Sequence, residues 1–284
     1  MELRTDDDER PMPRARLARR LRRMRENRGL SLRALADELG YPHTYLNRVE
    51  RGEQLPSPAL AEALDTFFEL DEVFTELLEL ARDASIPDYG RQAVAWEDQA
   101  VRFQMFNSSV IPGLLQTEDY ARALIRVSLA TASEERVQEL VDIRMRRKRI
   151  FAKPEPPLYW GVMDEAALAR PVGGPKKMYH QMHALLQHAA VPRNTLLVLP
   201  FSQGEYPAQG GSLVLLTRKN GTKAAYVESF VHGESVETPE RVIDLTQRFE
   251  IICSKAMPPE DSVDLIRHYL REYEHAALQD EDDD

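Results

Sequence analysis

Apolar residues recur at helical spacing through the first third of the chain and predict five short helices. In the first helix, Leu17, Leu21 and Met24 share one face, while arginines occupy the other faces. Gly29 is suited to end this helix, and Ser31 is a typical N-cap for the next one. Further apolar runs with helical spacing follow two chain-breaking prolines and predict the last helices: Pro56, Pro58, Leu60, Leu64, Phe67, Phe68, Phe74, Leu77 and Leu78.

Four small or apolar residues within residues 31–52 predict two helices that cross at a steep angle. Ala36 is small where the second helix passes close to the first, and Gly40 can take the positive φ that ends the first helix. Leu46 and Val49 form the apolar face that docks the second helix. Their joint spacing, Ala-x3-Gly-x5-Leu-x2-Val, indicates a helix-turn-helix unit, whose second helix enters the major groove of DNA.

Positive charge is concentrated around this unit. Residues 10–56 contain twelve arginines and five acidic residues, whereas the whole chain has a net charge of −10. By itself, a basic helix face is as often a solvated surface as a surface that binds DNA. Combined with the helix-turn-helix spacing, however, a basic module on an acidic chain is typical of a DNA-binding domain.

The stretches LRRMRENRGLSLRALADELG and YLNRVERGEQLPSP resemble the xenobiotic-response-element type of helix-turn-helix, the lambda-repressor and Cro-like family, over residues 14–80. The resemblance implies an all-α, five-helix DNA-binding head. It implies an ion pair between Arg25 of the first helix and Glu50 of the recognition helix. The side chains expected to contact DNA are Arg33, His43, Thr44, Asn47, Arg48 and Arg51.

A second, α+β domain is predicted over residues 93–276, after a head at 13–82 and a junction at 83–92. Four to five strands are expected on short apolar runs bounded by Pro and Gly, at residues 100–106, 158–163, 195–200, 212–217 and 224–229. Helices are expected at residues 114–130, 133–151, 176–189, 239–257 and 259–278. The acidic ends, residues 1–12 and 277–284, are predicted to be disordered.

The second domain also has a recognisable sequence. VIPGLLQTEDYARAL, YWGVMDEAALARPVGG and VLPFSQGEYPAQGGSLVLL resemble an actinobacterial domain that follows this type of helix-turn-helix and has no assigned activity. The resemblance covers residues 90–275. It suggests a small partner protein encoded by a neighbouring gene.

Metal binding and catalysis are both weakly indicated in this domain. Three histidines on one predicted helix, with two acidic residues after a strand, are an incomplete ligand set for a metal: His180, His183, His188, Asp164 and Glu165. No Ser-His-Asp order, Walker loop or dinucleotide fingerprint is recognisable. We therefore expect no metal, no cofactor and no enzymatic activity.

Other polar residues of the second domain have two interpretations each. Glu165, Arg170 and Glu228 are candidates for a ligand-binding or partner-binding cluster, although a structural salt bridge explains them equally well. The basic run at 144–149 suits the C-terminus of a helix, and a surface for a partner protein is the next interpretation.

The cellular setting follows from what the sequence lacks. The single cysteine, Cys253, excludes an internal disulfide and is expected to be a buried small hydrophobe. There is no apolar run long enough to span a membrane and no N-terminal signal, so a cytoplasmic location without membrane contact is predicted.

These features together predict a sequence-specific transcription regulator. It would bind double-stranded DNA as a homodimer at a pseudo-palindromic operator, because one recognition helix makes few base contacts. Its second domain would sense a ligand or bind the small partner protein. One alternative is an antitoxin-like regulator that sequesters the partner. An alternative of another class is an enzyme that the helix-turn-helix delivers to DNA.

Overall fold

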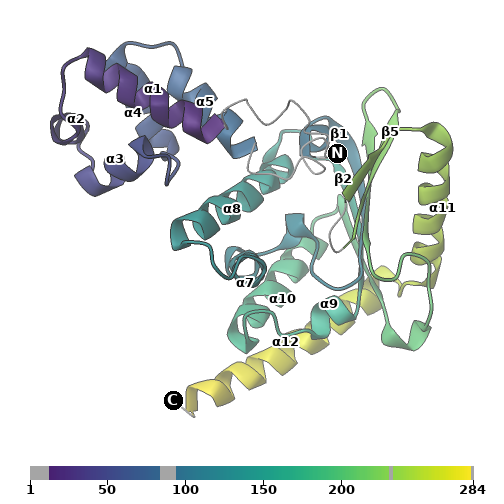
Figure 1. The fold of residues 1–284 in the computed structure, drawn as a ribbon. Coiled ribbons are helices and arrows are strands. Elements are labelled where there is room, and N and C mark those ends of the chain that lie inside the picture. Colours follow the sequence, from purple (N-terminus) through teal and green to yellow (C-terminus); the bar gives the residue numbers. More distant parts are fainter. Residues whose placement is uncertain (1–12, 84–93, 230–232, 283–284) are drawn as a thin grey trace, which may run out of the picture. The chain divides into compact units, whose positions relative to one another are not determined.

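The computed structural model describes residues 13–83, 94–229 and 233–282 (Figure 1). The chain divides into two compact units, residues 1–88 and residues 89–284. Predictions made for residues 1–12, 84–92 and 283–284 lie outside the described residues. Each unit has its own hydrophobic core.

The first unit consists of five α-helices in its described part, and the predicted all-α head is confirmed. They are α1 (Pro13–Asn27), α2 (Leu32–Leu39), α3 (His43–Glu50), α4 (Pro58–Phe68) and α5 (Val73–Asp83). The Ser31 hydroxyl accepts a hydrogen bond of 3.1 Å from the amide of Ala34 at the start of α2. Gly40 ends α2 with a φ of 70°, a conformation that favours glycine.

A buried carboxylate joins α4 to α5. Asp65 is 6% exposed, and its Oδ1 accepts a hydrogen bond of 2.7 Å from the amide of Phe74. Its Oδ2 accepts hydrogen bonds from the amide and the hydroxyl of Thr75, at 3.0 and 2.9 Å. These amides belong to the first turn of α5, where no intrahelical acceptor exists. Asp65 therefore caps α5 from the neighbouring helix.

The second unit is built on a mixed sheet of six strands in the order β3-β2-β1-β4-β5-β6. The strands are β1 (Ala100–Asn107), β2 (Leu158–Asp164), β3 (Asn194–Leu199), β4 (Ser212–Arg218), β5 (Lys223–Glu228) and β6 (Gly233–Val236). The first three are parallel, and β4, β5 and β6 each pair antiparallel with the preceding strand in this order. The predicted α+β class is confirmed, but the expected four to five strands omitted β6, whose sequence GESV is short and polar.

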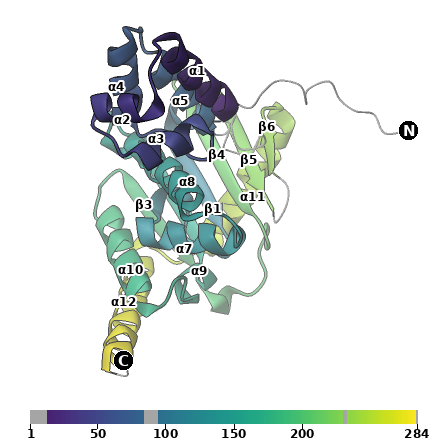
Figure 2. The ribbon, with the colours of Figure 1, turned by 60° about the vertical axis from the view of Figure 1, so that its left-hand side comes forward.

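Helices cover both faces of this sheet (Figures 1 and 2). One face carries α7 (Glu118–Ser128), α8 (Glu134–Arg147), the short α9 (Ala166–Ala169), α10 (Pro175–Ala189) and α12 (Pro259–Asp282), and the other carries α11 (Pro239–Lys255). Short 3-10 turns are η2 (Gly113–Leu115), η3 (Lys148–Ala152) and η4 (Phe201–Gln203). Alternation along β1 separates the cores, because Phe103 and Met105 point to the first face and Phe106 to the second.

The end of α12 differs from the prediction. The helix continues to Asp282, so residues 277–282 are helical where the acidic composition predicted a disordered tail. Ala276, Ala277, Leu278 and Gln279 are good helix formers and extend the helix beyond the buried Tyr273. None of the described helices combines the length and the apolar composition needed to cross a bilayer.

Candidate nucleic-acid interface

The recognition helix α3 is held on the head by one apolar face. Leu46 and Val49 are both 0% exposed in the core of the head. The Tyr45 hydroxyl also accepts a hydrogen bond of 2.7 Å from the amide of Ser57, which fixes the chain that leads into α4. The side of α3 opposite these residues is left facing outward.

The outward side of α3 carries the residues predicted to contact bases. His43 and Thr44 are exposed in its first turn, and Asn47 and Arg48 are half-buried one turn later. Residues three and four positions apart are neighbours on a helix surface, so His43 lies next to Asn47, and Thr44 lies next to Asn47 and Arg48. These four side chains therefore form a continuous polar face. Hydrogen-bonding groups of this kind can reach the edges of bases in a major groove.

Two further predicted contacts, Arg33 and Arg51, flank this face. Arg33 is exposed in the first turn of α2, and Arg51 is the exposed C-cap of α3. A guanidinium N–H of Arg51 donates to the Glu53 carboxylate at 2.7 Å, and both side chains are largely exposed. Exposed pairs contribute little free energy, so Arg51 can exchange Glu53 for a DNA phosphate.

The ion pair that the resemblance implied is present. Arg25 donates from Nε and Nη2 to the two carboxylate oxygens of Glu50, each at 2.7 Å. Its Nη1 also donates to the carbonyl of Leu30 at 2.8 Å. The side chains are 13% and 11% exposed, and the hydrogen bond to Glu50 raises the pKa of Arg25. This pair joins α1 to the C-terminal end of α3.

A second arginine of α1 holds the turn that follows α3. This contact was not predicted from the sequence. Arg14 donates from Nε to the carbonyl of Gly52 at 2.6 Å and also contacts the carbonyl of Glu53. The turn after α3 is thereby tied to the first turn of α1. A terminal arginine in a basic helix gives no sequence signal for such a contact.

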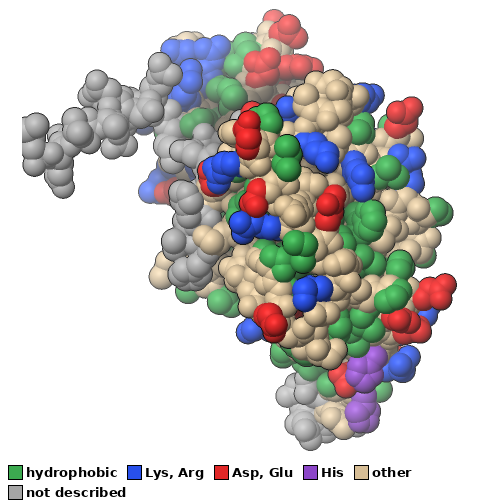
Figure 3. Space-filling view, turned by 90° about the vertical axis from the view of Figure 1, so that its right-hand side faces the viewer, with side chains coloured by type: hydrophobic (Ala, Val, Ile, Leu, Met, Phe, Trp, Pro, Cys, Tyr) green, Lys and Arg blue, Asp and Glu red, His purple; other side chains and the backbone are tan. Residues whose placement is uncertain are grey.

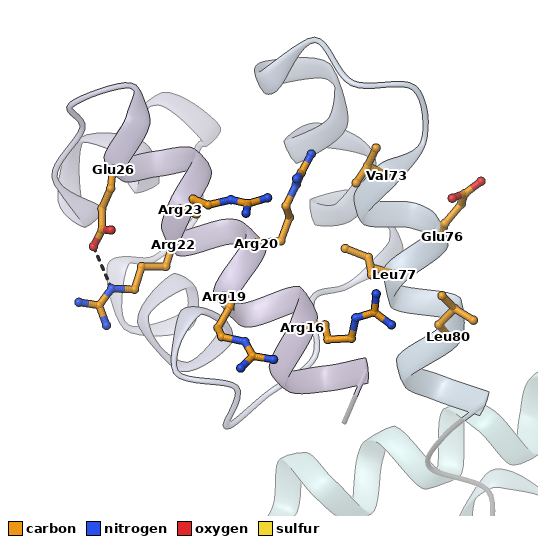
Figure 4. A pocket seen from close by; sticks show the side chains of 10 residues that line it. All are labelled: Arg16, Arg19, Arg20, Arg22, Arg23, Glu26, Val73, Glu76, Leu77 and Leu80. Carbon is orange, nitrogen blue, oxygen red and sulfur yellow. Dashed lines mark hydrogen bonds and ion pairs between the residues drawn. The ribbon is translucent and has the colours of Figure 1, made fainter. Parts of the chain in front are cut away.

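A groove between α1 and α5 is lined by a further group of arginines (Figure 4). Its volume is about 760 Å³, and its lining residues are Arg16, Arg19, Arg20, Arg22, Arg23, Glu26, Val73, Glu76, Leu77 and Leu80. Of its two carboxylates, Glu26 is paired with Arg22 at 2.8 Å. The groove therefore keeps excess positive charge on the head. Basic and acidic side chains are instead interspersed on the α11 face of the second unit (Figure 3).

The glutamates predicted to cluster in the second unit lie apart. Glu165 follows β2 and accepts hydrogen bonds from the Tyr269 hydroxyl at 2.9 Å and the Phe201 amide at 2.7 Å. Glu228 ends β5, and both β1 and β4 lie between β2 and β5. At normal strand spacing this is about 14 Å across the sheet. Arg170 is exposed after α9, so the three residues do not form the single cluster that was expected.

The three histidines of α10 do not share one environment. His180 and His183 are exposed, whereas His188 is half-buried, with its ring against that of Phe151. Within the described ranges no three His, Cys, Asp or Glu side chains are grouped as a metal site would need. Cys253 is half-buried in α11, and burial raises the pKa of its thiol to about 11.

Comparisons with known proteins agree with this division of the chain. A family model described as a helix-turn-helix domain matches residues 16–78. A second model, described as a domain of unknown function (DUF5753), matches residues 91–268. No curated protein and no solved structure matches the chain. The first match supports a DNA-binding regulator.

Proposed function

We propose that this chain, which belongs to the DUF5753 family and also has a helix-turn-helix domain, is a sequence-specific transcription regulator of the xenobiotic-response-element type. The observation that carries the proposal is the polar outer face of α3. His43, Thr44 and Asn47 lie opposite the buried Leu46 and Val49, so α3 can enter a major groove without exposing core residues.

A gel shift tests this function. The full-length protein is incubated with the DNA upstream of its own gene, in the presence of excess unrelated duplex. Retardation that survives the competitor supports sequence-specific binding. Retardation that the competitor abolishes would leave non-specific attraction to phosphates, and the proposal would fail.

Replacing Arg48 by alanine should relax base preference at one position of the operator and cost ~1–3 kcal/mol of binding free energy. The reason is that a guanidinium can donate two hydrogen bonds to a guanine edge. The main-chain carbonyl of Arg48, which accepts from the amides of Glu53 and Gln54, is kept in the variant. Dissociation constants for the operator and its single-base variants, measured at one salt concentration, give the result.

Arg51→Ala is the matched control for that measurement. Because Arg51 lies beyond the helix, the variant should weaken binding to all operator variants by a similar factor. If Arg48→Ala behaved in the same uniform way, Arg48 would contact a phosphate and its assignment to a base would be wrong.

Dimeric binding is expected at a pseudo-palindromic site. One recognition helix supplies three or four base contacts of ~1–3 kcal/mol each, which is too little to select one site in a genome. Two half-sites about 34 Å apart double the contacts. Footprinting with sedimentation of the complex should give two protected half-sites and two chains per duplex. One chain that protects a single half-site would contradict the prediction.

The C-terminal domain is proposed to be regulatory, as a sensor of a small ligand or a holder of a small partner protein, and not an enzyme. The hydrogen bonds that Glu165 accepts from Tyr269 and Phe201 support a structural role for a residue that was a candidate for ligand or partner binding. Co-purification with the product of an adjacent small gene would favour the partner protein. A DNA affinity that changes with a small molecule would favour the sensor.

A further inference from the structure

The basic run at residues 144–149 divides into two groups of side chains. Arg147 donates to both carboxylate oxygens of the buried Glu97, and Arg149 pairs with Asp98 at 3.0 Å on the surface. Arg144 and Lys148 turn instead toward the connection between η2 and α7. They are four residues apart, so they lie on the same side of the chain as α8 passes into η3.

Both cations meet at one neutral residue. Arg144 donates from Nη1 to the side-chain Oε1 of Gln116 at 2.8 Å, and Lys148 donates from Nζ to the main-chain carbonyl of Gln116 at 2.8 Å. Gln116 is 1% exposed, and its Nε2 donates to the carbonyl of Ile111 at 2.7 Å. Two positive charges are thus held next to each other by hydrogen bonds to the same buried residue, Gln116.

No carboxylate makes an ion-pair contact with Arg144 or Lys148 in the described part of the chain. The ion pairs that this run makes there with Glu97 and Asp98 belong to Arg147 and Arg149. Glu228 and Glu97 both act on Arg144 through their charges, without an ion-pair contact to it. Partly buried cations without a contacting anion are unusual, because burial of a charge is costly unless it is paired.

Burial lowers three pKa values at this place, and neighbouring positive charge contributes to two of them. Burial, with the nearby charge of Arg147, lowers the pKa of Arg144 to about 10. Burial also lowers the pKa of Lys148, and burial together with Lys148 lowers the pKa of His188. An added anion would stabilise the charged forms of all three groups.

We propose that Arg144 and Lys148 form a binding site for the phosphate or carboxylate group of a small anionic ligand. Both residues are half-buried, so each keeps part of its surface accessible to solvent. The guanidinium offers further N–H donors in a fixed fork, and the ammonium adds a point charge. The proposal rests on the regulatory role proposed for this domain and names the chemical class of its effector.

Titration calorimetry on the full-length protein, without DNA, tests the site. Inorganic phosphate and citrate are used as separate probes, against chloride at constant ionic strength. At least one probe should bind saturably, and Arg144→Met and Lys148→Met should each weaken its binding roughly tenfold or more. Arg149→Met is the matched control from the same run and should bind like the wild type.

Two results would overturn the site: no saturable binding of either probe, or equal binding by the wild type and both methionine variants. Arg144→Lys keeps the charge and should retain part of the affinity. If thermal unfolding without anion shows that Arg144→Met does not fold, the comparison of Lys148→Met with the wild type tests the site.

A gel shift without phosphate or citrate separates the anion site from the proposed DNA-binding function, because all these variants should still retard operator DNA. Loss of DNA binding by the wild type would overturn the proposed regulator and leave the anion site standing.

Discussion

Replacing Glu50 by alanine is expected to lower the free energy of unfolding of the head by about 3–5 kcal/mol. The change removes both acceptors of the Arg25 fork and leaves a cation that is 13% exposed. Arg25 keeps its hydrogen bond to the Leu30 carbonyl and a weak contact of 3.7 Å with Glu26. These remaining contacts favour the lower end of that range.

Adding Arg25→Met to Glu50→Ala should recover much of the loss, because the unpaired charge is then gone. Unfolding of the full-length protein is followed by far-ultraviolet circular dichroism. Trp96 and Trp160 are the two tryptophans of the chain and belong to the second unit, so their fluorescence reports that unit separately.

The control for this cycle is Glu26→Ala, which removes a pair with Arg22 and the weak contact with Arg25. The side chains of Glu26 and Arg22 are 52% and 66% exposed. Exposed pairs contribute little to stability, so this variant should unfold almost like the wild type. Additive losses from Glu50→Ala and Arg25→Met in the double variant would show that the two residues do not stabilise each other.

Asp65→Ala should cost about 3 kcal/mol of unfolding free energy, because two helix-terminal amides lose their acceptor and one of them is buried. Asp65→Asn keeps one acceptor oxygen and should cost less. Asp37→Ala, at an exposed position of α2, is the control and should change little. The same dichroism experiment measures all three. A loss from Asp65→Ala no larger than that from Asp37→Ala would contradict the capping role.

The head could be predicted from sequence where its signals are local. The cap at Ser31, the turn at Gly40 and the docking residues Leu46 and Val49 each act within a few positions of the element they define. Arg25 and Glu50 lie far apart in sequence and were paired through the family resemblance. Asp65 was missed, because its partners belong to the next helix, although a carboxylate on the apolar face of α4 is a usable signal.

The second unit was less predictable because its sheet order is non-local. The strands that place Glu165 and Glu228 were predicted, but nothing in their sequences indicates that β1 and β4 lie between them. The role of the basic run likewise depends on Gln116, which lies 28 residues before Arg144. Helix-forming residues at the end of α12 outweighed the acidic composition that predicted disorder.

The structure also divides the arginines that composition had treated as one basic region. Arg14 and Arg25 make contacts within the head, a second group lines the groove between α1 and α5, and Arg48 and Arg51 belong to the region of α3. Net charge predicts attraction to DNA, whereas the contacts decide which side chains remain for recognition.

The most direct test of sequence-specific regulation is selection of bound duplexes from a random DNA pool by the full-length protein. We expect enrichment of one pseudo-palindromic sequence, with half-sites about one helical turn apart. Arg48→Ala should select the same sequence with one position relaxed in each half-site. Retention of all sequences alike, with an affinity set by salt alone, would show that the protein does not bind a specific sequence.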